Sequence, residues 1–151
     1  MDPVQTSPEL SELLSIASRK LRTSFNAMVA AHGLTYSRAL ALLHLSRRPC
    51  RTQKDLGEDL DLENATVVRL LDGMERLGLI RRKPVEGDRR AKHVVLTEHG
   101  REQAALVSRI IQELRGIVLT GIDPADVAVT KAVLRMITAN LEQAAVEHAD
   151  A

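Results

Sequence analysis

The chain has 151 residues, an apolar fraction of 44% and a formal net charge of +1, which suits one soluble globular domain with a core of its own. Aromatic residues make up only 1% of the sequence, so the stacking platform on which binders of RNA and single strands usually rely is missing. Because the net charge is small, any attraction to duplex DNA has to come from local clusters of basic residues.

The first predicted element is a long amphipathic helix over residues 8–33, where apolar residues recur at steps of three and four until Gly33 ends the helix. A second helix begins after the capping residue Thr35. It ends before Pro49, because proline disfavours a helical conformation in the residue that precedes it. The apolar face of this second helix is Ala39, Leu42, Leu43 and Leu45.

A short third helix and a longer fourth helix are separated by only a few residues, which is the spacing of a helix-turn-helix. Thr52 and Asp55 form a capping box at the start of the third helix. The fourth helix begins at Glu63 or Asn64 and ends at Gly78, since glycine readily adopts the left-handed conformation of a helix C-terminus. The buried stripe predicted for the fourth helix is Val67, Leu70, Leu71, Met74 and Leu77.

The opposite face of the fourth helix carries small and polar side chains. Short side chains let a helix backbone approach the base edges in a major groove, and an arginine there binds either a phosphate or a guanine. The sequence leaves open which of these two Arg69 would contact. The residues predicted to face DNA are Asn64, Ala65, Thr66, Val68 and Arg69.

Two strands follow Gly78 and meet at a turn marked by Pro84 and Gly87, which predicts a β-hairpin. Its tip carries Arg89, Arg90 and Lys92, opposed by Glu86 and Asp88. A cationic tip of this kind can enter the minor groove beside the fourth helix. A solvated charged surface is the alternative interpretation. The hairpin carries further basic residues at Arg81, Arg82 and Lys83, and a second basic cluster comprises Arg47, Arg48, Arg51 and Lys54.

Two more helices complete the chain, the fifth capped by Thr97 and the sixth opened by Asp123 and Pro124. The predicted apolar stripe of the sixth helix is Val127, Val133, Leu134, Ile137 and Leu141. Together with the first helix, these helices carry more apolar surface than a small winged core can cover, which predicts a closed twofold homodimer. Such a dimer would present two fourth helices to successive major grooves about 34 Å apart, and hence bind a pseudo-palindromic site. The predicted fold is mainly α, an α+β winged helix with six helices and a two-stranded wing.

The sequence shows no constellation typical of an enzyme, a metal site or a cofactor site: the five histidines have no ligand spacing and no glycine-rich phosphate loop is present. A winged-helix module that binds protein is an alternative, although such domains usually lack a basic wing tip.

No apolar run is long enough for a signal peptide or a membrane span, and the lone Cys50 cannot form an intramolecular disulfide, so we expect a cytoplasmic protein. Cys50 lies beside Arg51, which leaves a thiol-based redox sensor as an alternative function.

The segments ATVVRLLDGMERLGLI and GDRRAKHVVLTEHG resemble the MarR family of bacterial winged-helix regulators, and within it the SlyA branch, whose V-R-x-L-D, D-R-R-A-K and L-T-E patterns they share. The resemblance covers nearly the whole chain and implies a single MarR-type domain over residues 1–151. Residues 8–33 and 98–147 would supply the dimerisation helices, and residues 35–97 the DNA-binding lobe. The family resemblance implies an obligate homodimer that binds double-stranded promoter DNA near the nucleoid and represses transcription or displaces silencing proteins.

The resemblance also assigns roles to individual residues. Arg69 matches the recognition-helix arginine of that branch, and Arg90 matches the wing arginine that enters the minor groove. Asp88 matches the wing acid, whose expected role is to hold the wing arginines in shape. In the alternative interpretation, Arg69 and Arg90 only form surface ion pairs with Asp72 and Asp88, which would contribute little.

Many relatives are released from DNA by small aromatic acids. The resemblance suggests that a phenolic or aromatic carboxylate binds near Arg19, Arg22 and Tyr36, because a guanidinium fork matches a carboxylate. Ala39 and Leu43 stand where close relatives have a tryptophan and a histidine, so the surroundings of such a ligand differ here. Two ordinary solvated arginines on an amphipathic helix are the alternative.

Overall fold

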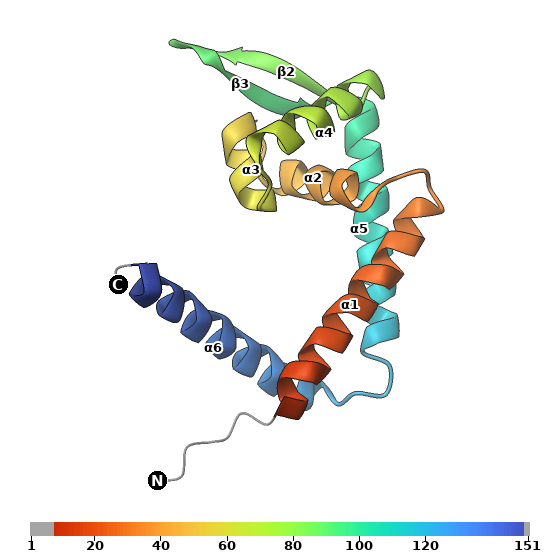
Figure 1. Ribbon diagram of the computed structural model, residues 1–151. Helices are drawn as coiled ribbons and strands as arrows, with labels where there is room; N and C mark the ends of the chain where they lie inside the picture. The colour runs from red at the N-terminus through yellow and green to blue at the C-terminus, as the bar shows by residue number, and fades with distance from the viewer. Residues whose placement is uncertain (1–7, 150–151) are drawn as a thin grey trace. The chain divides into compact units, whose positions relative to one another are not determined.

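The computed structural model describes residues 8–149, and Figure 1 shows how the helices and strands follow one another. In chain order these elements are α1 (Pro8–Ala30), α2 (Tyr36–Arg47), β1 (Arg51–Thr52), α3 (Gln53–Leu60), α4 (Asn64–Arg76), β2 (Ile80–Val85), β3 (Asp88–Leu96), α5 (Glu98–Val118) and α6 (Pro124–Ala149). The chain divides between Leu114 and Arg115 into two compact units, and each is described by itself. The predicted winged-helix class is confirmed.

The core of the first unit lies where α2, α3 and α4 pack against one another and against the strands. The apolar face predicted for α2 is confirmed, since all four of its residues are buried. Each fully buried aliphatic side chain contributes about 1.5–3 kcal/mol of transfer free energy. The largest fully buried side chains are Leu42, Leu56, Leu71, Met74, Ile80, Val29, Val67, Val94 and Val107.

The predicted helix caps are present. The Thr35 hydroxyl accepts a hydrogen bond from the backbone N–H of the third residue after it, at 3.3 Å. At the start of α3, Thr52 and Asp55 each accept a bond from the other's backbone N–H, at 3.1 and 3.0 Å. Thr97 and Asp123 cap α5 and α6 in the same way, at 3.0 and 2.7 Å. These side chains satisfy N–H groups that have no partner within a helix, which is why the elements begin where the sequence predicts.

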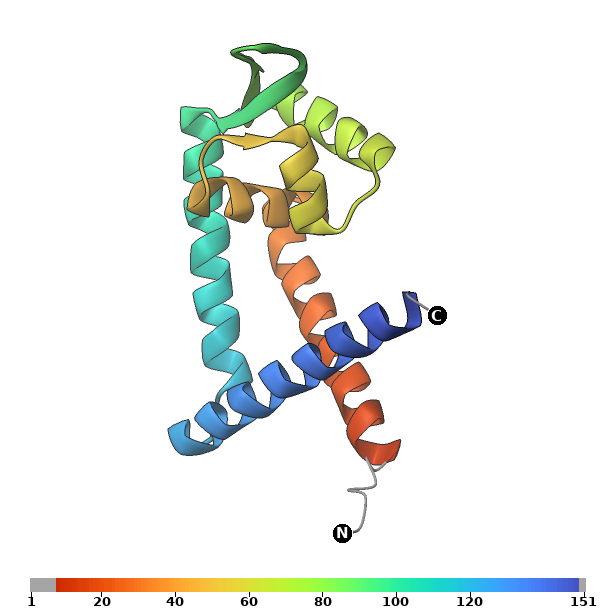
Figure 2. The same cartoon turned by 90° about the vertical axis from the view of Figure 1, so that its left-hand side faces the viewer.

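The sheet contains one more strand than the two predicted for the wing. The hairpin of β2 and β3 is antiparallel, and β1 pairs with the other edge of β3, so the strand order is β1-β3-β2. Figure 2 shows β1 leading directly into α3. Its register sets Arg51 opposite Val94 and Thr52 opposite His93. A strand of two residues is too short to show the alternation by which strands are recognised in a sequence.

One prediction about burial is wrong, and one helix ends earlier than predicted. Leu77 was expected in the buried stripe of α4, but its side chain is 51% exposed, because α4 ends at Arg76 and Leu77 is the C-cap. The first helix ends at Ala30 and not at Gly33, which lies in the following turn with a φ of 76°. Within α1 the side chains of Phe25 and Val29 are buried. The apolar residues of its first turns are largely exposed, and they are Leu10, Leu13, Ile16 and Leu21.

The second unit is dominated by α6, a helix of 26 residues. Of the stripe predicted for it, Val127 and Ile137 are half-buried, whereas the other members are exposed. The exposed large apolar side chains of α6 are Val129, Val133, Leu134, Met136, Leu141 and Val146. Within residues 8–149, no helix combines the length and the apolar character that a membrane span requires.

The start of α5 approaches Leu79, the residue before β2, so closely that only glycine fits at position 100. A Cβ atom on Gly100 would lie 1.9 Å from the carbonyl oxygen of Leu79. The backbone N–H of Thr97 donates to that same oxygen at 3.1 Å, and the Thr97 hydroxyl donates to the carbonyl of Gly78. The L-T-E sequence, which begins with the last residue of β3, therefore joins the start of α5 to the segment that follows α4.

Candidate nucleic-acid interface

Helix α4 presents the predicted recognition face. The buried residues Val67, Leu71 and Met74 hold one side of the helix against the core. The residues predicted to face DNA lie on the other side, where Val68 is half-buried and the remaining four are exposed: Asn64, Ala65, Thr66 and Arg69. Figure 1 shows α4 alongside the hairpin of β2 and β3.

A tight turn joins α3 to α4. Asp61 ends α3 in the left-handed conformation, with a φ of 51°, and the backbone N–H of Leu62 donates to the carbonyl of Gly57 at 2.9 Å. A Cβ atom at Gly57 would lie only 3.0 Å from Cγ2 of Val67. Glycine thus permits the close approach of the two helices, and the arrangement is a helix-turn-helix.

The wing tip carries the predicted basic side chains Arg89, Arg90 and Lys92, and all three are exposed. The Asp88 carboxylate accepts hydrogen bonds from the backbone N–H groups of Arg90 at 2.8 Å and Ala91 at 3.3 Å. Asp88 therefore holds the backbone at the start of β3, which carries these cations. Among the ion pairs of the described residues, none involves Arg69 or the three basic residues of the tip.

Asp72 pairs with Arg82 of β2 and not with Arg69, so the alternative in which Arg69 is held by Asp72 is not what the structure shows. The Arg82 side chain is 19% exposed, and its Nε atom lies 3.5 Å from Oε2 of Glu75. One guanidinium thus joins the wing to two carboxylates of α4. From the sequence, Arg82 was counted among the basic residues of the wing. Because it lies two residues after the buried Ile80, however, its side chain is on the inward face of the strand.

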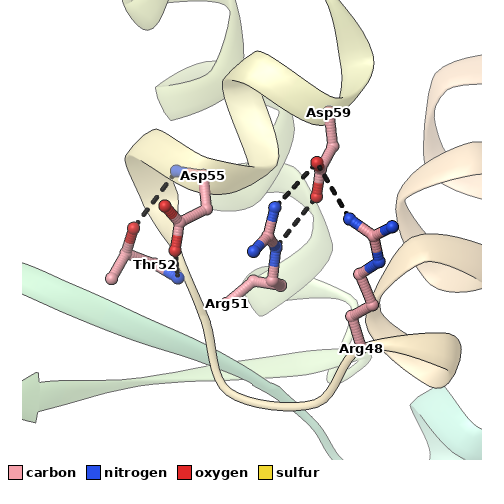
Figure 3. A network of polar contacts seen from close by, with 5 residues as sticks. All are labelled: Arg48, Arg51, Thr52, Asp55 and Asp59. Atoms are coloured by element: carbon pink, nitrogen blue, oxygen red, sulfur yellow. Dashed lines mark hydrogen bonds and ion pairs between the residues drawn. The ribbon is translucent and has the colours of Figure 1, made fainter.

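The second basic cluster is partly neutralised within the protein (Figure 3). The Arg51 guanidinium donates to both carboxylate oxygens of Asp59, at 2.9 and 2.7 Å, and an Arg48 nitrogen lies 3.8 Å from the same carboxylate. The hydrogen bond to Asp59 raises the pKa of Arg51 above its ordinary value. Arg47 and Lys54 are exposed. This cluster therefore offers fewer free cations to a phosphate backbone than its sequence predicts.

The capping box beside this ion pair changes the titration of Asp55. The hydrogen bond from the backbone N–H of Thr52 lowers the pKa of Asp55 from its ordinary value of 3.8, and the hydrogen bond with the Thr52 side chain lowers it further. A carboxylate that accepts hydrogen bonds is favoured in its charged form. The start of α3 is thus held by a charge-assisted contact (Figure 3).

Arg19 and Arg22, predicted to bind a carboxylate, line the same shallow hollow on α1, together with Leu14, Ser15 and Ser18. The Arg22 guanidinium carbon lies 4.4 Å above the centre of the Tyr36 ring. Tyr36 also packs edge-on against Phe25, with ring centres 5.7 Å apart. Tyr36 does not line the hollow, and Ala39 and Leu43 are buried in the core.

Cys50 is exposed and adopts a left-handed conformation with a φ of 66° in the loop between α2 and β1. Across the described part of the chain, no group of three or more histidine, cysteine, aspartate or glutamate side chains is placed to hold a metal ion.

Comparison with known proteins agrees with this geometry. The sequence profile of the MarR family matches residues 32–91. The organic hydroperoxide resistance transcriptional regulator of Bacillus subtilis (strain 168) is 33% identical over 118 residues, which are 78% of each chain. The crystal structure of the transcriptional regulator PA3341 shares 41% sequence identity with a TM-score of 0.78, over 89% of this chain and 98% of that chain. The MepR–DNA complex of S. aureus shares the fold, with a TM-score of 0.78 at 23% identity over 86% of this chain and 96% of that chain. The chain belongs to the MarR family.

Proposed function

We propose that this protein is a homodimeric transcriptional regulator that binds double-stranded promoter DNA at a pseudo-palindromic site. The observation that carries the proposal is the pairing of an exposed, small and polar face on α4 with an adjacent hairpin tip of three exposed cations that form no ion pair among residues 8–149. The alternative interpretation, a solvated charged surface, does not explain why these cations lie beside a helix-turn-helix in which Gly57 lets α3 and α4 approach closely. Solved relatives with the same fold include MepR and a Listeria monocytogenes regulator, each crystallised with DNA.

In this proposal α4 enters the major groove and the wing enters the neighbouring minor groove. Asn64, Thr66 and Arg69 offer hydrogen-bonding groups to base edges or phosphates, while Ala65 and Val68 offer apolar contacts to thymine methyl groups. Arg89, Arg90 and Lys92 enter a groove whose negative potential is enhanced where it is narrow. Because the net charge of the chain is only +1, these local cations supply most of the electrostatic attraction.

The dimer is supported by the apolar side chains that a single chain leaves uncovered on α1 and on α6. A soluble protein rarely exposes so many large apolar side chains unless a partner covers them. A second copy of the chain would cover both helices through a twofold axis. The spacing of two α4 helices by about 34 Å would then set the spacing of the two half-sites.

We further place the protein in the SlyA branch, on the V-R-x-L-D, D-R-R-A-K and L-T-E patterns of its sequence. As a member of that branch it would act as a repressor or by displacing silencing proteins. Release from the operator by a small aromatic carboxylate is supported by the hollow that Arg19 and Arg22 share on α1. The cation–π contact with Tyr36 holds Arg22 in place beside that hollow.

A second candidate function is an oxidant response through Cys50. The Bacillus subtilis relative is named for organic hydroperoxide resistance, and Cys50 is the one cysteine of this chain and is exposed. Treatment with cumene hydroperoxide would then release the wild-type protein from DNA but leave the Cys50→Ser variant bound. Equal binding of both proteins after treatment would exclude this candidate.

The proposed function is tested by fluorescence anisotropy with DNA fragments from the promoter of the protein's own gene, at two salt concentrations. We expect specific binding that weakens steeply with salt, since several phosphates lose their counterions. Scrambled DNA of the same length is the control. A folded protein that binds neither fragment at low ionic strength contradicts the proposal.

A further inference from the structure

A cavity of about 400 Å³ lies in the first unit, apart from both the recognition face and the hollow on α1. Its walls come from the end of α2, the loop that contains Cys50, strand β3 and the first half of α5. Figure 2 shows the end of α2 and strand β1 beside α5. This volume falls within the range of roughly 300–1,000 Å³ that small-molecule sites occupy.

The lining of this cavity is mostly apolar, and Ser46 and Ser108 add hydroxyl groups to it. Leu45, Val94, Leu96 and Ala105 supply aliphatic surface. Arg101 is the cationic side chain of the lining, and one of its nitrogens donates to the carbonyl oxygen of Leu96 at 3.1 Å. No ion pair of Arg101 is present within residues 8–149.

We propose that this cavity binds a small apolar carboxylate, with its carboxylate on Arg101 and its hydrocarbon tail against β3 and α5. A guanidinium carries several N–H donors in a fixed plane, so the bond to Leu96 orients Arg101 and leaves a pair of donors for a carboxylate. The aliphatic part of the lining favours hydrocarbon over water. Charge complementarity and apolar burial thus select the same class of molecule, an anion with an aliphatic tail. This inference does not depend on DNA binding.

Cys50 makes the proposal directly measurable, because it lines the cavity and is the chain's single thiol. The test follows the rate at which a thiol reagent labels Cys50 in the purified full-length protein. We expect millimolar octanoate to slow labelling at least fivefold, and octanol, which has the same tail without the charge, to have a much smaller effect. Calorimetry with octanoate should report the same affinity as the protection from labelling.

Three variants separate this cavity from other sites. Arg101→Gln should abolish the protection by octanoate, and Ala105→Phe should abolish it by filling the cavity. Arg109→Gln removes an exposed positive charge from the same helix outside the cavity lining, and this variant should bind octanoate as the wild type does. Circular dichroism verifies that each variant is folded. If either Arg101→Gln or Ala105→Phe fails to fold, the other variant still tests the proposal.

Three results would overturn the proposal: equal protection by octanol and octanoate, retained protection in folded Arg101→Gln protein, or equal loss of protection in folded Arg109→Gln protein. The last result would mean that any positive charge on α5 attracts the anion. Failure of the protein to bind promoter DNA would leave the cavity result unaffected, so the two proposals fail separately.

Discussion

Two arginines of one hairpin differ in what surrounds them. Arg82 is largely covered and contacts Asp72 and Glu75, whereas Arg90 lies exposed at the tip and forms no ion pair among the described residues. Strand alternation explains the difference at Arg82, because it shares the inward face of β2 with Ile80. Residue type alone therefore does not tell which arginine is available to DNA.

Replacing Arg90 by alanine should weaken binding to every DNA sequence, since a minor-groove arginine contributes through charge and groove shape. The slope of log affinity against log salt should fall by about 1. Anisotropy titrations at several salt concentrations measure both effects. Glu86→Ala at the same tip is the matched control, and we expect it to bind DNA at least as tightly as the wild type. An Arg90→Ala protein with unchanged affinity and slope would exclude the wing contact.

Arg69→Ala distinguishes the two roles left open for that residue. If Arg69 contacts a guanine, the variant should lose about 1–3 kcal/mol of discrimination at one base position. If it contacts a phosphate, all sequences should be weakened alike and the salt slope should fall. Binding measured on a set of single-base operator variants separates these outcomes, and no change in either quantity would remove Arg69 from the interface.

Gly100→Ala should destabilise the fold, because the new Cβ would overlap the Leu79 carbonyl oxygen unless the backbone moved. Overpacking of this kind costs about 1–3 kcal/mol. Gly116→Ala in the same helix is the control, since nothing lies within 4 Å of its added Cβ, and alanine favours a helix by about 1 kcal/mol. Urea unfolding monitored by circular dichroism measures both changes. Equal stability of the two variants would show that α5 does not pack against the Leu79 carbonyl as described.

The wing and the recognition helix are joined as elements by the Arg82 guanidinium. Arg82→Gln should therefore loosen the orientation of the wing and weaken operator binding several-fold. The salt slope should stay unchanged, because Arg82 faces carboxylates of α4 and not a phosphate. Arg81→Gln, at an exposed position of the same strand, is the matched control for charge. A reduced salt slope in Arg82→Gln would show that this arginine contacts DNA.

Helix α3 depends on Asp55 in a way that pH reveals. Hydrogen bonding lowers the folded-state pKa of Asp55 below 3.8, so its contribution to stability is present above that pH and is lost as the pH falls through the folded-state pKa. Asp55→Asn should thus lower the Tm at pH 7, and the difference from wild type should shrink below about pH 4. Thermal unfolding at pH 7, 5 and 3 tests this, and a constant difference across that range would contradict it.

The whole molecule has an imbalance between its apolar surface and the core that a single chain can build. Leu141 and Met136 on α6 are each 66% exposed, and Leu13 on α1 is 56% exposed. In a monomer these side chains would stay in contact with water, which is unfavourable for apolar surface. A second copy of the chain that covered them would remove this cost, which is why we expect a dimer to be the folded and functional species.

Leu141→Glu should dissociate the dimer, because it introduces a charge where burial is expected. Sedimentation velocity should then show a monomer, and operator affinity should fall at least tenfold as the two half-sites are no longer bound together. Gln143→Glu adds the same charge at a polar position of the same helix and should remain dimeric. A dimeric, fully active Leu141→Glu protein would place the interface elsewhere.

Features that depend on neighbours along the chain were predictable from the sequence. The caps at Thr35, Thr52 and Thr97 each bond to a group three residues away, and the buried stripes of α2 and α5 follow the helical period. The D-R-R-A-K pattern is likewise local, since it forms the start of β3. The position of Leu77 was not predictable in this way, because the period continues past the residue at which α4 ends.

Contacts between elements were decided only when the chain folded in three dimensions. Arg82 and Asp72 are ten residues apart, and Arg51 and Asp59 are eight apart, so their pairing depends on how strands and helices dock and not on a local period. The addition of β1 to β3 and the contact of Gly100 with Leu79 have the same origin. Hydrogen-bonded caps and amphipathic faces depend on residues within one or two helical turns of each other, so they can be predicted from the order of residues in the sequence. The choice of which charged residues stay free for a ligand requires the positions of their neighbours in space.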